Sequence, residues 1–227
     1  LYILGYFIKK YTFFLSKRNY MQNLNNDYDK SISINTNNLI WTINDELHYK
    51  EQLLSVDEDK KTSILELNKH SILSKKLAVK SVEIFVLEGT YSNEFGDFEK
   101  GTYLNLPVEK QEKVFCKESC KIFRKENYHA HYENIIIDTN KEEWLEGQGN
   151  LKVMPLLEST ALVFWPKDEV FIPHKHWGGE EIYVLSGTFM DEHGEFEKDT
   201  WVRNHHLSVH HPFVKEETII FVKPGHI

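Results

Sequence analysis

The stretch His174-Lys175-His176-Trp177-Gly178-Gly179-Glu180 decides the fold, together with the apolar run Ile182-Tyr183-Val184-Leu185 that follows it. Side chains two apart on an extended strand share a face, so His174 and His176 point the same way. The paired glycines allow a turn, and Glu180 opens the next strand. Histidine pairs also occur by chance on exposed strands, but His210 adds a third imidazole farther along. Three imidazoles and a carboxylate suit zinc, iron, manganese or nickel, so a metal site is predicted.

The spacing of these residues resembles the two motifs of the cupin superfamily. The first motif, G-x5-H-x-H-x3,4-E-x6-G, falls on Asp168, His174, His176, Glu180 and Gly187. The second motif, G-x5-P-x-G-x2-H, falls on Asp199, His205, Leu207 and His210. Every interval fits, although the first glycine of each motif and the proline and inner glycine of the second are replaced.

More narrowly, residues 178–204, GGEEIYVLSGTFMDEHGEFEKDTWVRN, resemble the ChrR-like cupins. This metal-binding domain occurs in certain anti-sigma factors and in stand-alone proteins. In that family the equivalents of four residues bind zinc, and the resemblance implies the same ligands here: His174, His176, Glu180 and His210. Zinc is therefore the first choice of metal, with iron, manganese and nickel as alternatives.

An internal repeat extends this reading to the first half of the chain. Shifting the sequence by 98 residues lays residues 83–102 on residues 181–200 with twelve of twenty positions identical and no gap. A match of this quality predicts two copies of one structural unit. We therefore expect tandem cupin barrels, a bicupin. The expected division is a disordered N-terminal extension over 1–37, a degenerate metal-free cupin over 38–127 and a metal-binding cupin over 128–227.

The two copies differ at the ligand positions. Under the same shift, the four candidate ligands meet Lys76, Ala78, Val82 and Glu112. Alanine and valine have no polar side-chain atom, and a cationic lysine has no lone pair to give. One metal ion per chain is predicted, in the C-terminal barrel. Fused barrels are also expected to pack face to face as a pseudo-dimer, which leaves further homodimerisation open.

The repeat also separates the adjacent carboxylates Glu180 and Glu181. Neighbours on a strand face opposite sides, so only one of them faces inward with the histidines. Position 181 stays glutamate in the first copy, as Glu83, whereas position 180 becomes Val82. We predict that Glu180 is the ligand and that Glu181 faces out, toward a basic group.

The remaining histidines and the barrel lining carry weaker expectations. His205 and His206 are candidates for supporting the metal ligands from behind. His129-Ala130-His131 imitates the ligand pair but lacks the following glutamate and glycine, so a surface position is expected, as for His193. His211 would face away from His210. Generic barrel-lining residues are expected at Phe164, Phe171 and Ile182.

Length and local pattern predict an all-β fold. Short aromatic and β-branched runs separated by turn signals indicate strands, and few segments sustain a helical period. The 227 residues suffice for two domains of about 100 residues each. The predicted strands are Ile64-Leu65, Ile84 to Leu87, Leu162 to Trp165, Ile182 to Leu185 and Thr218 to Val222.

The composition of the chain limits the classes of partner that it can bind. The formal net charge of −8 argues against nucleic acid, which binds basic surfaces. Residues 1–20 contain apolar patches that are interrupted by Lys9-Lys10 and are too short for a membrane span. The segment also lacks a signal-peptide cleavage site. We expect translation from Met21 and no membrane partner, with a membrane-surface segment as the alternative. Cys116 and Cys120 imply no disulfide framework, which favours ordinary thiols and a cytoplasmic location.

Two functions remain open from the sequence. Four protein ligands around zinc would close the shell, as in a structural, sensing or regulatory module. A six-coordinate iron, manganese or nickel ion would keep open positions, as in a dioxygenase acting on a small organic ligand in the C-terminal barrel. No substrate and no separate general base are evident.

Overall fold

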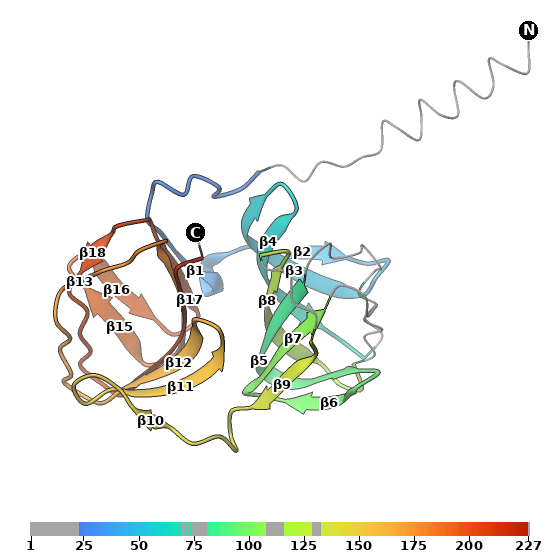
Figure 1. Ribbon diagram of the computed structural model, residues 1–227. Helices are drawn as coiled ribbons and strands as arrows, with labels where there is room; N and C mark the ends of the chain where they lie inside the picture. The colour runs from blue at the N-terminus through green and yellow to red at the C-terminus, as the bar shows by residue number, and fades with distance from the viewer. Residues whose placement is uncertain are drawn as a thin grey trace, which may run out of the picture.

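The computed structural model describes residues 23–69, 71, 73, 81–107, 116–128 and 133–226. Several expectations lie outside the described residues: those for residues 1–22, for Lys76, Ala78 and Glu112, and for the His129-Ala130-His131 run. Figure 1 shows two sheet bodies side by side, with the C-terminus between them.

The N-terminal barrel is built on an eight-stranded antiparallel sheet in the order β2-β3-β4-β8-β5-β7-β9, with β6 paired to β5. Its strands are β2 (Thr42–Asn44), β3 (Tyr49–Asp57), β4 (Lys60–Leu67), β5 (Ser81–Asn93), β6 (Gly96–Glu99), β7 (Thr102–Pro107), β8 (Cys120–Glu126) and β9 (Ile135–Asp138).

The C-terminal barrel combines a seven-stranded sheet, β1-β17-β14-β19-β12-β11-β10, with the two-stranded sheets β13-β18 and β15-β16. A 3-10 helix, η1 (Thr36–Asn38), follows β1 (Ile32–Asn35). The other strands are β10 (Leu145–Glu146), β11 (Lys152–Leu157), β12 (Thr160–Trp165), β13 (His174–Lys175), β14 (Glu180–Ser186), β15 (Thr188–Asp191), β16 (Gly194–Glu197), β17 (Thr200–Asn204), β18 (Val209–His210) and β19 (Thr218–Pro224).

The all-β prediction is confirmed, since each predicted strand lies within an observed one: β4, β5, β12, β14 and β19. Alternation along β14 explains the layering. Ile182 and Val184 point into the C-terminal barrel, whereas Tyr183 points out of it. No helix within the described part of the chain is long and apolar enough to cross a membrane.

The two copies share a glycine requirement at the same hairpin. Gly89 and Gly187 both have φ of +71°. A Cβ at these positions would lie 2.2 Å from the carbonyl oxygen of Ser119 and 2.4 Å from that of Glu217, respectively. Ser119 and Glu217 are themselves related by the repeat shift, so the identity of sequence reflects one backbone geometry built twice.

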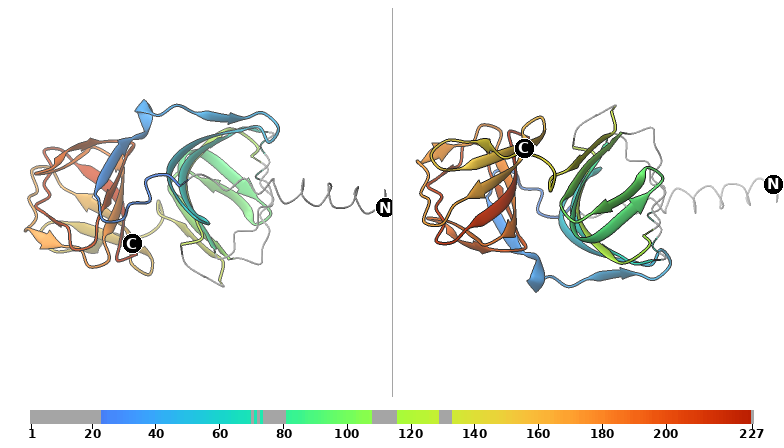
Figure 2. Two further views of the ribbon diagram at one scale, coloured as in Figure 1. Left: turned by 90° about the horizontal axis from the view of Figure 1, so that it is seen from above. Right: turned by 90° about the horizontal axis from the view of Figure 1, so that it is seen from below.

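The expectation of disorder before residue 38 is wrong for residues 32–35. Residues 32–35 form β1, which pairs with β17 of the C-terminal barrel from Ile32↔Arg203 to Asn35↔Thr200. In return, β9 from the second half pairs with β7 of the N-terminal barrel. β1 covers an edge of β17 that would otherwise leave backbone groups unpaired, so a segment expected to be disordered is ordered by tertiary pairing. Figure 2 shows the lead-in crossing between the two barrels.

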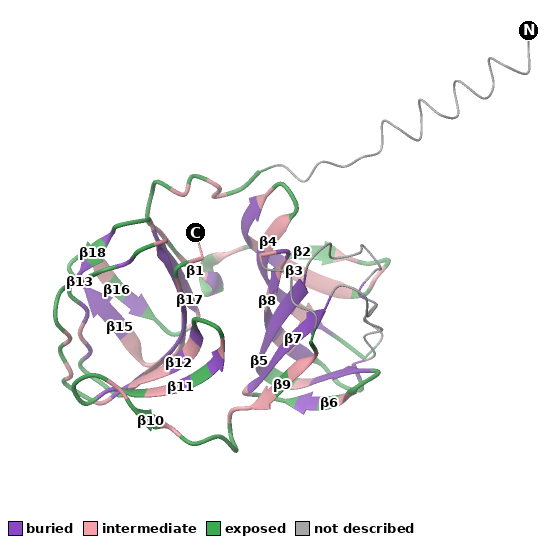
Figure 3. Cartoon of the chain, viewed as in Figure 1, coloured by how far each residue is buried: buried purple, intermediate pink, exposed green. Residues whose placement is uncertain are grey.

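The barrels pack face to face through a shared apolar core, which confirms the predicted pseudo-dimer. Leu54, Phe85 and Phe123 from the first copy and Tyr183 and Phe221 from the second belong to one buried cluster. The Phe123 and Tyr183 rings stack at 5.1 Å between centroids. Figure 3 shows buried residues along β5, β7 and β8 in one barrel and along β17 in the other.

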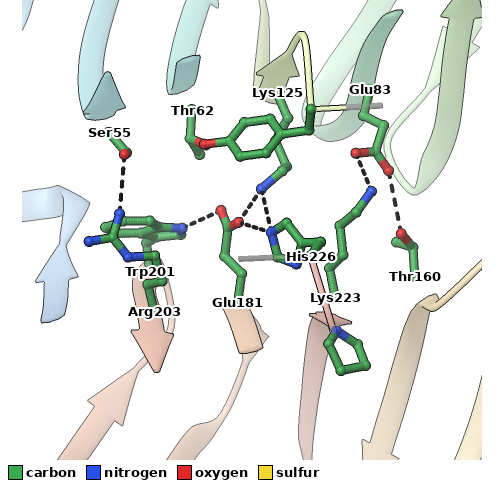
Figure 4. A network of polar contacts seen from close by, with 12 residues as sticks. Ser55, Thr62, Glu83, Lys125, Thr160, Glu181, Trp201, Arg203, Lys223 and His226 are labelled. Atoms are coloured by element: carbon green, nitrogen blue, oxygen red, sulfur yellow. Dashed lines mark hydrogen bonds and ion pairs between the residues drawn. The ribbon is translucent and has the colours of Figure 1, made fainter. Parts of the chain in front are cut away.

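Two buried ion pairs cross this interface, as Figure 4 shows. Lys223 donates to Glu83 at 2.6 Å (Nζ–Oε2), and Lys125 donates to Glu181. The repeat shift carries Glu83 onto Glu181 and Lys125 onto Lys223, so the pairs are related by the pseudo-twofold symmetry. Glu181 also accepts from Trp201 Nε1 at 2.6 Å. The prediction that Glu181 faces out toward a basic group is confirmed.

Candidate metal centre

Three elements bring the candidate ligands to one end of the C-terminal barrel. His174 on β13 lies opposite His210 on β18 in the antiparallel register. His176 follows β13, and a turn at Gly178, with φ of +76°, leads to Glu180 at the start of β14. A Cβ on Gly178 would lie 2.9 Å from the Cα of Gly225, so glycine is required there.

The three imidazoles converge through their Nε2 atoms. His176 Nε2 lies 2.9 Å from His210 Nε2, which lies 3.3 Å from His174 Nε2. Glu180 Oε2 lies 3.3 Å from His176 Nε2 and 3.7 Å from His210 Nε2. The ligand atoms of the three histidines all lie within 4.8 Å of one another, and the Glu180 carboxylate lies beside two of them.

These separations fit a metal ion. Zinc takes nitrogen ligands at about 2.0–2.1 Å, which places tetrahedral donors roughly 3.3 Å from one another. His210 Nε2 lies 2.9 and 3.3 Å from the other two imidazole nitrogens, and Glu180 Oε2 lies 3.3 and 3.7 Å from His176 and His210, which is near that value. The donor set is also chemically right, because neutral imidazole nitrogen and carboxylate oxygen both offer lone pairs.

Burial disfavours charge on three members of the cluster, whereas for His210 the hydrogen bond to Asp191 and the charge of Glu180 outweigh burial and raise the pKa. Burial raises the pKa of Glu180 to about 7. Burial, together with the neighbouring His210 and His174, lowers the pKa of His176 to about 3. Burial also lowers the pKa of His174. A divalent ion at the centre would stabilise the carboxylate and use the neutral imidazoles as ligands.

Two residues that the sequence reasoning missed support the ligands from outside. Asp191 Oδ2 lies 3.2 Å from His210 Nδ1, and Asn204 Nδ2 lies 3.4 Å from Glu180 Oε2. The repeat could have indicated both residues. The first copy has Asn93 in place of Asp191 and Leu106 in place of Asn204, so both side chains change in the copy that lacks the ligands.

A pocket of about 340 Å³ lies against the cluster. Apart from the candidate ligands, its described lining is uncharged and includes Leu151, Val163, Trp165, Phe171, Phe189 and Ile220. The prediction that Phe164 lines the barrel is wrong. Alternation along β12 turns Phe164 away from the barrel, where its ring meets Trp144 at 6.1 Å between centroids.

Comparison with known proteins agrees with this geometry. The family model of the ChrR Cupin-like domain matches residues 29–130 and again residues 132–227. The chain belongs to the ChrR cupin-like family. The tandem arrangement inferred from the repeat is thereby confirmed. No curated protein matches the sequence.

Solved structures share the bicupin fold at low identity. A Nostoc punctiforme protein described as a candidate dioxygenase is 15% identical, with TM-score 0.70 over 86% of this chain and 82% of that chain. A cupin 2 conserved barrel domain protein from Leptotrichia buccalis is 16% identical, with TM-score 0.61 and coverage of 84% and 94%. A point mutant of Bacillus subtilis oxalate decarboxylase is 10% identical, with TM-score 0.61 and coverage of 86% and 78%. These likenesses concern the fold alone.

Among the described histidines, His205 and His206 do not join the cluster. His205 Nδ1 lies 2.9 Å from Ser31 Oγ, and His206 Nδ1 accepts from the backbone N–H of Gly178 at 2.9 Å. Of the two candidates for supporting the ligands, His205 contacts the lead-in segment, and His206 contacts the backbone of the turn between His176 and Glu180. His193 and His211 are exposed, as expected.

Proposed function

We propose that this bicupin holds one divalent metal ion in its C-terminal barrel, with His174, His176, Glu180 and His210 as ligands. The observation that supports it is the convergence of three Nε2 atoms and one carboxylate oxygen at mutual distances suited to an ion. Zinc is the first choice, because three imidazoles and a carboxylate complete its preferred four-coordinate shell. A site closed in this way would serve a sensing or regulatory role.

The first barrel contributes no ion in this proposal. Val82, at the position of Glu180, is 7% exposed and packs in the apolar core of the N-terminal barrel. An apolar side chain at this point removes the carboxylate and fills its space. One ion per chain follows.

Elemental analysis of the purified 227-residue chain tests this stoichiometry. We expect one equivalent of metal in the wild type and none in the His174→Ala/His176→Ala variant. Circular dichroism checks that this variant still folds, and a Lys175→Ala variant, changed at the exposed position between the two histidines, serves as the matched control. Two tightly held ions per chain, or retention of metal by the double variant, would contradict the proposal.

A second candidate function is a dioxygenase-type metalloenzyme, and the apolar pocket favours it. The pocket opens directly beside the ligands, so an ion with more than four positions would face it. Its volume is at the lower end of the range for small-molecule sites, and its uncharged lining suits a small apolar molecule. Trp165, which lines the pocket, has a buried Nε1–H without a hydrogen-bond partner among the described residues. A ligand oxygen would satisfy it.

Cobalt substitution separates the two candidates. Co²⁺ absorbs visible light according to its coordination number, and azide enters only an open position. An azide-dependent change in the spectrum of the cobalt-loaded protein supports the enzyme. A four-coordinate spectrum that azide leaves unchanged supports the closed, sensing site.

A further inference from the structure

We propose that Asp191 is a positioning residue, one that fixes the ring orientation and tautomer of His210 for metal binding. The inference rests on the proposed metal site and assigns a role to a residue outside the ligand set. Asp191 lies at the end of β15, in a hairpin that closes the barrel beside the cluster.

The carboxylate of Asp191 is held rigidly by the hairpin turn. Its Oδ1 accepts from the backbone N–H of His193 at 2.7 Å and from that of Gly194 at 3.2 Å. The side chain is only 2% exposed. Because Oδ1 is occupied by the turn, Oδ2 is directed at His210 Nδ1 from a fixed point, 3.2 Å away.

The chemistry of this contact selects one tautomer. An ionised carboxylate only accepts hydrogen bonds, so the His210 nitrogen that faces it must carry the proton. The lone pair of a neutral imidazole is then on Nε2, the atom that points at His174 and His176. A carboxylate that holds the far nitrogen of a metal-ligating histidine orients the ring and raises its basicity.

The first repeat copy shows that the hairpin turn itself does not require a carboxylate at this position. The repeat shift places Asn93 at the position of Asp191. Asn93 Oδ1 accepts from the backbone N–H of Phe95 at 2.8 Å, as Asp191 Oδ1 does from His193. The hairpin thus needs only one side-chain oxygen, and an amide supplies it. The second oxygen is present in the copy that has a histidine to orient.

The variant Asp191→Asn tests the inference, because it reproduces a residue that the same hairpin already accommodates. The amide oxygen can keep the turn contacts, while an NH₂ group would replace the acceptor facing His210. His210 Nδ1 would then have to accept, which moves the proton to Nε2 and blocks the metal-binding lone pair. We expect zinc affinity to fall about 10- to 100-fold in competition with a chromophoric chelator.

A control and a second readout make the outcome unambiguous. Glu195→Gln removes an exposed carboxylate from the same hairpin and should leave zinc affinity unchanged. In metal-free protein at about pH 9, above the ordinary histidine range, ¹⁵N NMR should show His210 protonated at Nδ1 in the wild type and at Nε2 in Asp191→Asn.

The possible results separate this inference from the proposed function. Zinc affinity in Asp191→Asn within about twofold of the wild type, or a wild-type His210 protonated at Nε2, would overturn the role of Asp191. Absence of zinc binding by the wild type with the Nδ1–H tautomer present would refute the metal site alone.

Discussion

At the scale of single residues, Glu180 and Glu181 show how one strand serves two purposes. Glu180 faces the histidine cluster, 3.3 Å from His176 Nε2. Glu181 faces the opposite barrel and pairs with Lys125. Both carboxylates are buried, but Glu181 has a lysine beside it, whereas Glu180 has imidazoles and the amide of Asn204.

Substitution of these two neighbours should have opposite consequences. Glu180→Gln is expected to weaken metal binding about tenfold or more, because a charged ligand becomes a neutral one. Glu181→Gln should leave metal affinity nearly unchanged but lower the free energy of unfolding by about 3 kcal/mol or more, since it leaves Lys125 buried without its counter-charge. Metal titration and urea unfolding of both variants measure this. The reverse order of metal affinities would refute the ligand assignment.

The Glu83–Lys223 pair should make stability depend on pH. Burial raises the pKa of Glu83, but attraction to Lys223 and Lys125 outweighs it and holds the pKa below its ordinary value of 4.5. A carboxyl with a lowered folded-state pKa stabilises the protein fully above the unfolded-state value, and this contribution is lost as the pH falls toward the folded-state pKa. We expect the stability difference between wild type and Glu83→Gln to be constant above pH 4.5 and to shrink below it.

Urea unfolding between about pH 7 and about pH 3 measures that difference directly. The exposed residue Glu99, which is not in the interface, provides a matched variant, Glu99→Gln, that should show no such dependence. A stability difference for Glu83→Gln that grows on acidification would show that the carboxyl is protonated in the folded protein.

At the scale of elements, the exchange of β1 and β9 ties each barrel to the other half of the chain. β1 lies against β17, the strand that carries Arg203 and Asn204. The buried Arg203 reaches the lead-in as well, with a hydrogen bond to the carbonyl oxygen of Asp27 at 3.1 Å. Residues preceding the expected domain boundary are therefore part of the C-terminal fold.

A chain that begins at residue 38 should lose stability although it retains every strand of the expected cupin units. Removal of β1 exposes an edge of β17 and takes away the contacts that Ile32 and Ile34 make with the shared core. We expect a lower melting temperature and a tendency to aggregate. A chain that begins at residue 23 is the control. Thermal unfolding and size-exclusion chromatography compare the two, and equal melting temperatures would show that β1 is dispensable.

At the scale of the whole molecule, the shared interface is expected to make the two barrels unfold as one unit. The shared core contains residues of both copies, and the crossed ion pairs lie within it. A barrel that unfolded alone would leave its partner with an exposed apolar face and an unpaired buried charge. In the proposed function, the N-terminal barrel is a structural support for the barrel that holds the ion.

Metal binding should consequently stabilise the entire chain. A ligand that binds only the folded state adds about 2.7 kcal/mol at a free concentration of 100 times Kd. We expect calorimetry to show one unfolding transition that moves to higher temperature as a whole when zinc is added. The His174→Ala/His176→Ala variant should show one transition that zinc does not move. If calorimetry showed two transitions and zinc raised the temperature of only one of them, the barrels would unfold independently.

The sequence by itself determined the all-β class, the tandem cupin architecture and the inward face of β14. Each depends on local information: strand periodicity, motif spacing and a repeat of identical residues. Even the outward direction of Glu181 followed from alternation and from its retention as Glu83. These features are encoded within one strand or hairpin, so a linear pattern records them.

Only the tertiary structure decided the strand exchange, the contact of Asp191 with His210 and the identity of Lys125 as the partner of Glu181. The four residues Ile32-Ser33-Ile34-Asn35 alternate apolar and polar side chains as a short strand does, but their pairing partner, the edge of β17, lies far along the sequence. Likewise, the Lys125–Glu181 pair joins residues from different barrels. Such contacts depend on how finished sheets meet in space, where burial and pairing energies outweigh local preference.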